Sequence, residues 1–281
     1  MTKTWFITGC STGFGRALTQ HLLSLGEQVV VTARDPRQLT DLVAGHEAKA
    51  LALKLDVTKQ EHIASSIKAA EDRFGAIDVL VNNAGHGYFG AFEETDIPRA
   101  KRMFDVNLWG VVEVTRAALP AMRRRRAGTI VNFSSVGGLT AFPSLSFYAA
   151  TKFAVEALSE GLSRETAELG IKVLIVEPSA FRTDWGGRSA DRATGLIADY
   201  ASTAHATMDM VRGWSGQQSG DPQRAAEAIV AAVNAQQPPL RLLLGKAALS
   251  GARAKISEMQ RDFDAWADVT IGADFPGSPE T

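Results

Sequence analysis

Short apolar runs recur along the chain, and longer segments with helical periodicity separate them. The runs are rich in Val, Ile and Leu, alternate little with polar residues, and cover 5–8, 28–32, 50–55, 79–81, 129–133, 172–176 and 241–244. Strands buried on both faces of a parallel sheet have this pattern. The segments with the apolar spacing of amphipathic helices are 14–25, 59–74, 98–125, 147–169 and 222–234. Their alternation with the runs predicts right-handed crossovers and a doubly wound α/β fold.

Residues 185–221 break this rhythm. They are mostly small and polar, with Trp185, Tyr200 and Trp214 among them, and we interpret them as a partly helical insertion. Nothing in the middle of the chain resembles a linker, so residues 1–281 are expected to form a single domain. The tail after about residue 271 is expected to be loose.

Composition and charge exclude several classes of protein. A formal net charge of -1 leaves no basic face for nucleic acid. The four arginines at 123–126 end an expected helix, where cations suit the dipole; we interpret them as solvated, a partner or acidic ligand being the alternative.

The composition of the chain also indicates the cellular compartment in which we expect the protein. Cys10 is the only cysteine, so no disulfide forms within the chain, which fits a reducing compartment. No stretch reaches the ~18 apolar residues of a membrane span. The first run starts too early to leave room for a signal peptide. We expect a cytoplasmic protein without membrane or nucleic-acid partners. The sequence has no cluster of His, Cys and Asp at the spacing of metal ligands, so no metal site is expected.

The first apolar run leads into a glycine-rich turn, Thr8-Gly9-Cys10-Ser11-Thr12-Gly13-Phe14-Gly15. Glycines in such a turn let the backbone approach a pyrophosphate, and the following helix offers unpaired N–H groups and a positive dipole end. The spacing differs from the commoner G-x-G-x-x-G. A tight turn without a ligand is the alternative for this motif alone. The predicted dinucleotide contacts are Gly9, Ser11, Thr12, Gly13, Phe14 and Gly15.

The end of the second run indicates which dinucleotide is bound. NAD-dependent enzymes usually place Asp or Glu here for the ribose 2′-hydroxyl, whereas this chain has Ala33 followed by Arg34. A guanidinium suits a 2′-phosphate, so we predict NADP(H) in preference to NAD(H), with Arg34 as discriminator and Arg37 as a candidate second contact. Asp35 points the other way, because its carboxylate is able to pair with Arg34 or to contact a ribose.

Two further segments follow strands at the same expected edge. Asp56 and Val57 follow the third run and are predicted to hold the adenine, the carboxylate accepting from its amino group. Asn83, Ala84 and Gly85 follow the fourth run and are small enough for the backbone to approach the ribose. For each segment alone a turn or capping role is equally open. Their common place at the carboxyl ends of parallel strands favours cofactor binding.

Three residues predict proton chemistry. Tyr148 and Lys152 are four residues apart and share one face of a helix, and Ser135 ends the fifth run. A nearby ammonium, aided by an oxidised nicotinamide, is expected to lower the pKa of the phenol so that it exchanges a proton with an alcohol or ketone. Ser135 is expected to hydrogen-bond the carbonyl oxygen.

Asn107 lies inside an expected helix, where its propensity is mediocre. We predict that it holds a water that relays protons from Lys152; a local helix irregularity without a catalytic part is the alternative.

As a set, these motifs resemble the short-chain dehydrogenase/reductase family, and its hydroxysteroid and retinol dehydrogenase branch in particular. The resemblance covers roughly residues 3–185 and rests on T-G-x-x-x-G-x-G at 8–15, D-V at 56–57, N-N-A-G at 82–85, Asn107, Ser135 and Y-x-x-x-K at 148–152. It implies a single-domain Rossmann-type fold with a seven-stranded parallel sheet and helices on both faces. It also implies that Ser135, Tyr148 and Lys152 form a catalytic triad, which Asn107 completes to a tetrad.

The resemblance adds further expectations. Tyr148, Lys152, Pro178 and Thr183 are expected to contact the cofactor, Thr183 through the carboxamide. The family's usual Pro-Gly is Pro178-Ser179 here, and Thr12 stands where NADP-preferring members often have a basic residue. A homodimer or homotetramer is expected, with helices 98–125 and 147–169 in the interface.

The substrate is expected to be an apolar or aromatic ketone or alcohol, with the segment 185–221 as a lid that excludes water. The residues predicted to contact the substrate are His86, Phe142, Phe147, Phe181 and Trp185. For each of the aromatic residues, a place in the apolar core without substrate contact is the alternative.

Three functions are weighed. The first is an NADP(H)-dependent oxidoreductase that interconverts a ketone or aldehyde and an alcohol. The second is a cofactor-binding regulatory protein without turnover, which the intact tetrad disfavours. The third is a nucleotide-sugar epimerase or dehydratase, whose glycine spacing and larger C-terminal domain are missing.

Overall fold

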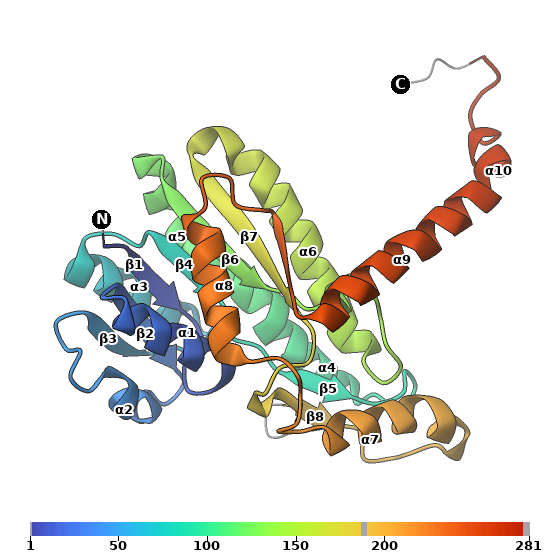
Figure 1. The fold of residues 1–281 in the computed structure, drawn as a ribbon, viewed down its shortest axis with the longest axis horizontal. Helices are drawn as coiled ribbons and strands as arrows, with labels where there is room; N and C mark the ends of the chain where they lie inside the picture. Colours follow the sequence, from blue (N-terminus) through green and yellow to red (C-terminus); the bar gives the residue numbers. More distant parts are fainter. Residues whose placement is uncertain (1, 187–189, 278–281) are drawn as a thin grey trace.

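The computed structural model describes residues 2–186 and 190–277, and its centre is a parallel sheet of seven strands (Figure 1). The strand order is β3-β2-β1-β4-β6-β7-β9. The strands in chain order are β1 Thr4–Ile7, β2 Gln28–Ala33, β3 Ala50–Lys54, β4 Val79–Asn82, β6 Gly128–Phe133, β7 Ile171–Pro178 and β9 Arg241–Leu244. The sheet therefore has the doubly wound order, with β1 beside both β2 and β4, and the predicted fold class is confirmed.

Helices cover both faces of the sheet because successive strand residues point to opposite sides. Ile7 of β1 packs into one apolar core with α1 and α8, whereas its neighbour Phe6 packs into the other core with α3 and α5. Both side chains are fully buried, which explains why the run shows no alternation. The helices that cover the sheet are α1 Gly13–Ser24, α3 Gln60–Phe74, α5 Gly110–Arg125, α6 Ser146–Thr166 and α8 Pro222–Asn234.

The helix expected over 98–125 is interrupted. It consists of α4 Ile97–Phe104, a wide π turn Asp105–Trp109, and α5. The π turn contains Asn107, so the local irregularity weighed from the sequence is present. The helix expected over 147–169 is α6 followed by a 3₁₀ turn, Ala167–Leu169.

The insertion 185–221 is partly helical, as predicted. It contains β8 Ala190–Arg192, a second π turn Ala201–His205 and α7 Ala206–Gly213. Strand β8 pairs in parallel with β5 Gly87–Phe89, which follows the N-N-A-G segment. The ring of His205 lies 2.7 Å from the buried carboxylate of Glu94, and these contacts hold the insertion against the body. Its function as a lid stays a prediction.

The sequence patterns did not predict the helices α2 Thr40–Val43, α9 Lys246–Ala265 and α10 Ala267–Ile271. Helix α9 leaves the sheet and projects from the body with α10 at its far end (Figure 1). The tail expected to be loose begins where α10 ends, and residues 278–281 of it lie outside the described part. Among the described helices, none is both long and apolar enough to cross a bilayer.

Candidate active site

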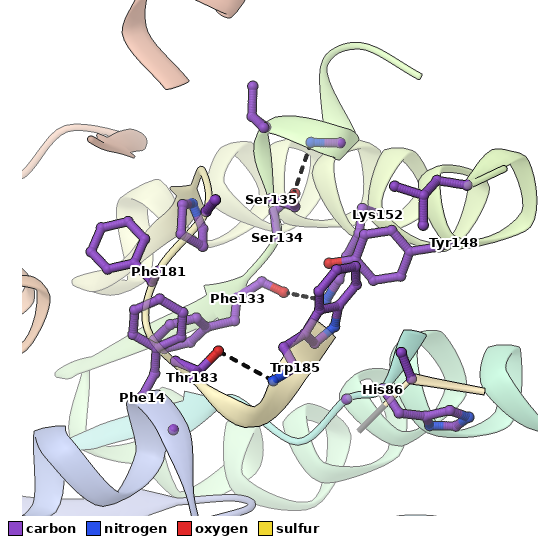
Figure 2. A pocket seen from close by; sticks show the side chains of 18 of the residues that line it. Phe14, His86, Phe133, Ser134, Ser135, Tyr148, Lys152, Phe181, Thr183 and Trp185 are labelled. Atoms are coloured by element: carbon purple, nitrogen blue, oxygen red, sulfur yellow. Dashed lines mark hydrogen bonds between the residues drawn. The ribbon is translucent and has the colours of Figure 1, made fainter. Parts of the chain in front are cut away.

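A cavity of about 1240 Å³ runs along the carboxyl ends of the strands. This volume exceeds the usual range for one drug-sized ligand. The glycine turn lies at one end and the Tyr148 region at the other (Figure 2). All the predicted cofactor residues line the cavity except Gly15 and the candidate second contact Arg37.

The glycines of the first turn are required by close backbone contacts. A Cβ on Gly15 would lie 2.4 Å from the carbonyl oxygen of Gly9 and 2.6 Å from the Asn83 amide nitrogen. Gly9 itself has φ +73 and contacts Ala84, so a side chain there is both strained and crowded. Asn83 in turn donates to the carbonyls of Thr8 and Gly9, each at 2.8 Å. The turn and the N-N-A-G segment therefore hold each other in place.

The first turn of α1 faces the cavity with unsatisfied donors. Thr12, at the N-cap position, makes no side-chain capping bond, and Ser11, Thr12 and Gly13 line the cavity. Free N–H groups and the positive end of a helix dipole complement a phosphate. This end of the cavity therefore has the chemistry of a pyrophosphate site.

Of the two arginines that follow β2, one faces the cavity and the other pairs with a neighbouring carboxylate. Arg34 lines the cavity. Arg37 does not: its guanidinium binds both carboxylate oxygens of Asp35, at 2.9 Å and 2.8 Å. The Asp35 side chain also caps the 3₁₀ turn Pro36–Leu39 by accepting from the Arg37 N–H. Asp35 is thus paired with Arg37 rather than Arg34, and Arg37 is not positioned as a second cofactor contact.

Asp56 and Val57 lie in the cavity wall beside Arg34. Burial opposes ionisation of Asp56, but hydrogen bonds from the Thr58 hydroxyl and N–H outweigh it and lower the pKa of the carboxyl. The carboxylate is therefore an acceptor at neutral pH. Val57 packs against Gly110, where a Cβ would lie 2.6 Å from it.

Ser135, Tyr148 and Lys152 come together as predicted. Lys152 lies one turn beyond Tyr148 on α6, and its ammonium donates to the carbonyl of Phe133 at 2.7 Å (Figure 2). The same ammonium lies 5.8 Å from the centre of the Tyr148 ring. Ser135 follows β6 and accepts from the Gly137 N–H at 3.0 Å, and its hydroxyl and the Tyr148 ring lie together beside Gly137. The Tyr148 ring points into the cavity (Figure 2).

Burial dominates the ionisation of this pair. It raises the pKa of Tyr148 to about 12, and the neighbouring Ser135 side chain only partly offsets it. Burial also lowers the pKa of Lys152 to about 8, against the opposing effect of Glu156 one turn further along α6. The expected lowering of the phenol pKa is therefore absent in the chain by itself. The reason is that low dielectric disfavours the charged form of both groups, and the lysine does not overcome this.

Asn107 has a different contact from the predicted one. Its side chain is fully buried and does not line the cavity. The amide accepts from the His86 N–H at 3.0 Å and donates to the His86 carbonyl at 2.9 Å. A longer bond, 3.3 Å, reaches Thr151 on α6. Asn107 thus fixes the loop after β4 to the catalytic helix, and the water relay stays a prediction.

Three of the five predicted substrate residues lie around the catalytic end. His86, Phe142 and Trp185 line the cavity, and the Trp185 ring lies 4.9 Å from the Tyr148 ring. Burial, followed by the charge of Arg34, lowers the pKa of His86, so its ring is neutral at neutral pH.

The other two lie elsewhere. Phe181 lines the cavity but packs on Phe14, 5.1 Å between ring centres, near the glycine turn rather than beside Tyr148 (Figure 2). Phe147 does not line the cavity; it stacks on Phe92 at 5.2 Å. It is the residue directly before Tyr148, and successive helix residues point in directions about 100° apart, so the two rings face different surroundings.

The end of β7 and the segment after it close the cavity between these ends. Pro178, Ser179 and Thr183 line it. The Ser179 hydroxyl donates to the Leu244 carbonyl, at 3.3 Å, and so has a partner on the neighbouring strand end. Thr183 accepts from the Trp185 N–H at 3.4 Å and lies against Gly13 of the glycine turn.

A family model described as short chain dehydrogenase matches residues 3–194. The chain belongs to the short chain dehydrogenase family. It is 36% identical over 275 residues to Oxidoreductase BOA17 of Botryotinia fuckeliana, covering 97% of this chain and 100% of that protein. Human retinol dehydrogenase 8 is 34% identical over 255 residues, 85% of this chain and 80% of that one. The protein is accordingly an oxidoreductase of this family.

Solved structures of the same family have the same fold as this chain. A short-chain dehydrogenase from Streptomyces avermitilis superposes with a TM-score of 0.92 at 43% identity, covering 97% of this chain and 98% of that one. An alcohol dehydrogenase from Thermococcus sibiricus, complexed with 5-hydroxy-NADP, has a TM-score of 0.71 at 26% identity, covering 87% and 96%. A 3-ketoacyl-(acyl-carrier-protein) reductase from Brucella melitensis, complexed with NADH, has the same score and identity, covering 87% and 98%. A nicotinamide cofactor is thereby supported.

This short chain dehydrogenase also has cavity residues that the sequence patterns missed. Met210, Val211 and Trp214 come from the α7 region, and Ser250, Ala254 and Glu258 from α9. The signal for α9 was present as a regular spacing of apolar residues between 249 and 266, outside the part of the chain that carries the family motifs.

We predict that Asn107→Ala weakens cofactor use more than Thr151→Val does. The alanine leaves the His86 N–H and carbonyl unpaired, which costs about 1–3 kcal/mol of folding free energy and roughly 2–4 °C of Tm per kcal/mol. It also releases the loop that carries Gly85 into the cavity, so the KM for NADPH should rise several-fold. Thr151→Val keeps both His86 contacts and should leave that KM near the wild-type value. Equal KM values in both variants would contradict this positioning role.

Proposed function

We propose that this protein is an NADP(H)-dependent oxidoreductase that interconverts a ketone or aldehyde and an alcohol. One observation carries the proposal. Tyr148 lies beside Ser135, with the Lys152 ammonium one helical turn away, in the same cavity that continues to the glycine turn. A proton donor and a dinucleotide cradle thus share one space, as hydride transfer to a carbonyl requires.

The chain's own contacts support a dinucleotide in this cavity. A Cβ on Gly15 would fill space that the turn needs, and the first turn of α1 presents N–H donors without side-chain caps. Ser11, Thr12 and Gly13 would hold the pyrophosphate, and Asp56 with Val57 the adenine. Thr183, with Pro178, would hold the carboxamide end. When bound, the nicotinamide supplies or accepts the hydride.

The residues of the chain supply the proton. In the reducing direction the Tyr148 hydroxyl donates its proton to the carbonyl oxygen, and the Ser135 hydroxyl donates a hydrogen bond to the same oxygen. The Lys152 ammonium stabilises the phenolate that remains. Because the pKa of Tyr148 is about 12, the phenol carries its proton at neutral pH. The chain alone is therefore in the state that reduction needs. In the oxidising direction each step runs in reverse.

The preference for NADP(H) rests on the cation after β2. Arg34 lines the cavity, and Asp35, the carboxylate that would favour a ribose hydroxyl, is paired with Arg37. That pairing leaves the Arg34 guanidinium to a 2′-phosphate.

The substrate class follows from the catalytic end of the cavity. Trp185 lies against Tyr148, and Phe142 and a neutral His86 complete an apolar and aromatic wall. Met210 and Trp214 of the insertion extend it. These side chains favour an apolar or aromatic ketone or alcohol, with the insertion as a lid that excludes water.

For the setting of the enzyme we retain the expectations from the sequence. A cytoplasmic homodimer or homotetramer is proposed, with α4, α5 and α6 in the family-type interface. The single cysteine, Cys10, is buried, and burial raises the pKa of its thiol to about 12, which makes it unreactive.

The proposal is tested by NADPH and NADH consumption with a panel of apolar and aromatic ketones, and by the reverse reaction with the matching secondary alcohols. We expect turnover with at least one pair. Tyr148→Phe should lower kcat at least about 10²-fold, the lower bound of a general-acid contribution, while NADPH binding is retained. Tight NADPH binding without turnover on any substrate would instead favour the cofactor-binding regulatory protein.

The pH dependence should report Lys152. Its pKa is about 8, so the ammonium is lost as pH rises through that value. We expect kcat/KM for NADPH, which reports the free enzyme, to fall about tenfold per pH unit above about pH 8. Lys152→Arg keeps its charge up to about pH 12, so any residual activity should lack this fall. An unchanged alkaline limb in Lys152→Arg would assign it to another group.

Arg34→Asp should reverse the cofactor preference. A carboxylate in place of the guanidinium repels a 2′-phosphate and accepts a bond from a ribose hydroxyl. The KM for NADPH should therefore rise at least about tenfold, a difference of about 1.4 kcal/mol, while the KM for NADH stays similar or falls. Arg224→Asp is the matched control, since that side chain is exposed and does not line the cavity. Equal changes for both cofactors in Arg34→Asp would remove Arg34 as the discriminator.

A further inference from the structure

The last described residues form an arm, largely helical, that the rest of the described molecule leaves uncovered. Helix α9 contacts the body at its first turns, where Ala248 and Ala252 are buried. From Arg253 to Gly277 every residue except Lys255 and Ala267 is exposed. Figure 1 shows this C-terminal arm, residues 253–277, projecting from the domain.

One side of the arm is apolar, with a regular repeat. Leu249, Ile256 and Phe263 recur every seven residues, and Ala252, Met259 and Trp266 follow each of them by three. We call the five large members the arm stripe; they are 43%, 67%, 42%, 61% and 64% exposed for Leu249, Ile256, Met259, Phe263 and Trp266. A seven-residue repeat with this 3–4 spacing is the pattern by which helices pair with one another.

The arm stripe faces away from the cavity. The α9 residues that line the cavity are Ala247, Ser250, Gly251, Ala254, Lys255, Glu258 and Arg261. At 100° per residue all of them except Lys255 lie on the side of the helix opposite the stripe, and Lys255 lies at the edge between the two sides. The stripe is therefore not part of the substrate wall. All five side chains of the stripe are exposed to solvent.

Exposure of so many apolar side chains to water is unfavourable in free energy. The two aromatic rings alone bury about 150–250 Å² each when covered, and with the aliphatic members the stripe offers on the order of 500 Å² per copy. Two copies would bury on the order of 1,000 Å² in all, the lower limit for a specific protein interface. The part of α9 that projects from the body is of a length that is marginal for an isolated helix in water, so a partner would also stabilise its helical order.

An exposed apolar helix face is able to bind either a membrane surface or another helix, and the charge of the arm distinguishes between these two partners. Residues 253–277 carry three cations and five carboxylates. A helix that binds a membrane surface is usually rich in Lys and Arg on its polar face, because bilayers are anionic. The excess of carboxylates disfavours that surface. The seven-residue repeat favours a second helix with the same repeat.

We propose that the arm stripe is the contact between two copies of this chain, with the two α9 helices packed antiparallel. In that orientation residues on the same flank of the stripe meet across the seam. Lys255 and Asp262 share one flank, seven residues apart, so Lys255 of each copy meets Asp262 of the other. Lys255 also lies 3.3 Å from Glu258 of its own chain, and its three donors suffice for both carboxylates. A parallel pair would place Gln260 beside Lys255 and offers no such complement.

The pairing has a consequence for the enzyme. The side of α9 opposite the stripe closes the outer part of the cavity, so a partner that holds α9 in place also holds that wall. This contact is separate from α4, α5 and α6, and its test does not depend on the proposed reaction.

The test is the mass of the full-length protein in solution, by sedimentation velocity or light scattering. We expect a dimer or a larger even assembly, and the double variant Ile256→Asp, Phe263→Asp should halve the mass at micromolar concentration. Ser257→Asp, Ala265→Asp adds the same charge to exposed positions outside the stripe and should keep the wild-type mass. Circular dichroism checks that both variants are folded. A monomeric wild type, or an unchanged mass in the stripe variant, would overturn the proposal.

The antiparallel orientation is tested by exchanging charges. Lys255→Asp sets two carboxylates together and should weaken dimerisation at least about tenfold, whereas Lys255→Asp with Asp262→Lys should restore it. Failure of the exchange to restore the dimer overturns the antiparallel arrangement. Flotation of the wild type, but not of the stripe variant, with vesicles of phosphatidylcholine and phosphatidylglycerol would show that the stripe binds a lipid surface instead.

Discussion

One buried hydrogen bond, from the Lys152 ammonium to the Phe133 carbonyl, fixes the geometry on which the catalytic end depends. It ties the middle of α6 to the last residue of β6. Because Tyr148 lies one turn earlier on that helix and Ser135 two residues beyond that strand, the same bond sets both relative to each other. The energy of the bond is that of a charged donor without water around it, which is larger than for a neutral pair but requires that the lysine stay buried.

That burial has opposite effects on the two titrating groups, and together they define the resting state. The phenol pKa is raised to about 12 and the lysine pKa is lowered to about 8, so near pH 7 the free chain holds a protonated tyrosine beside a charged lysine. An ionised Tyr148 needs a further positive charge nearby. An oxidised nicotinamide carries such a charge and a reduced one does not, so the direction of the reaction and the protonation of the tyrosine are linked.

The sequence was sufficient where the determinants are local. Buried strands, the glycine turn and the i,i+4 pair of Tyr148 and Lys152 are all set by neighbours in the chain, and the structure has them close to where they were expected. It was insufficient where partners are distant. The amide of Asn107 is bonded to a residue 21 positions away, and Phe147 turns from the cavity towards Phe92. The pKa of Tyr148 depends on burial by several elements, which no spacing in the sequence reveals.

Helix α9 shows a different limit, because its seven-residue repeat is present in the sequence but lies outside the alternation of strands and helices that predicts the fold. Helix α9 lies after the last strand, where no further sheet face is available to cover it. One side of a helix in that place closes the cavity at the sheet edge. The opposite side is free to contact a surface outside the domain. Its small and polar residues face the cavity and its large apolar residues face outward. The reverse arrangement would place the apolar residues over the substrate, so the order of residues along α9 is itself an argument that its outer side is built for contact.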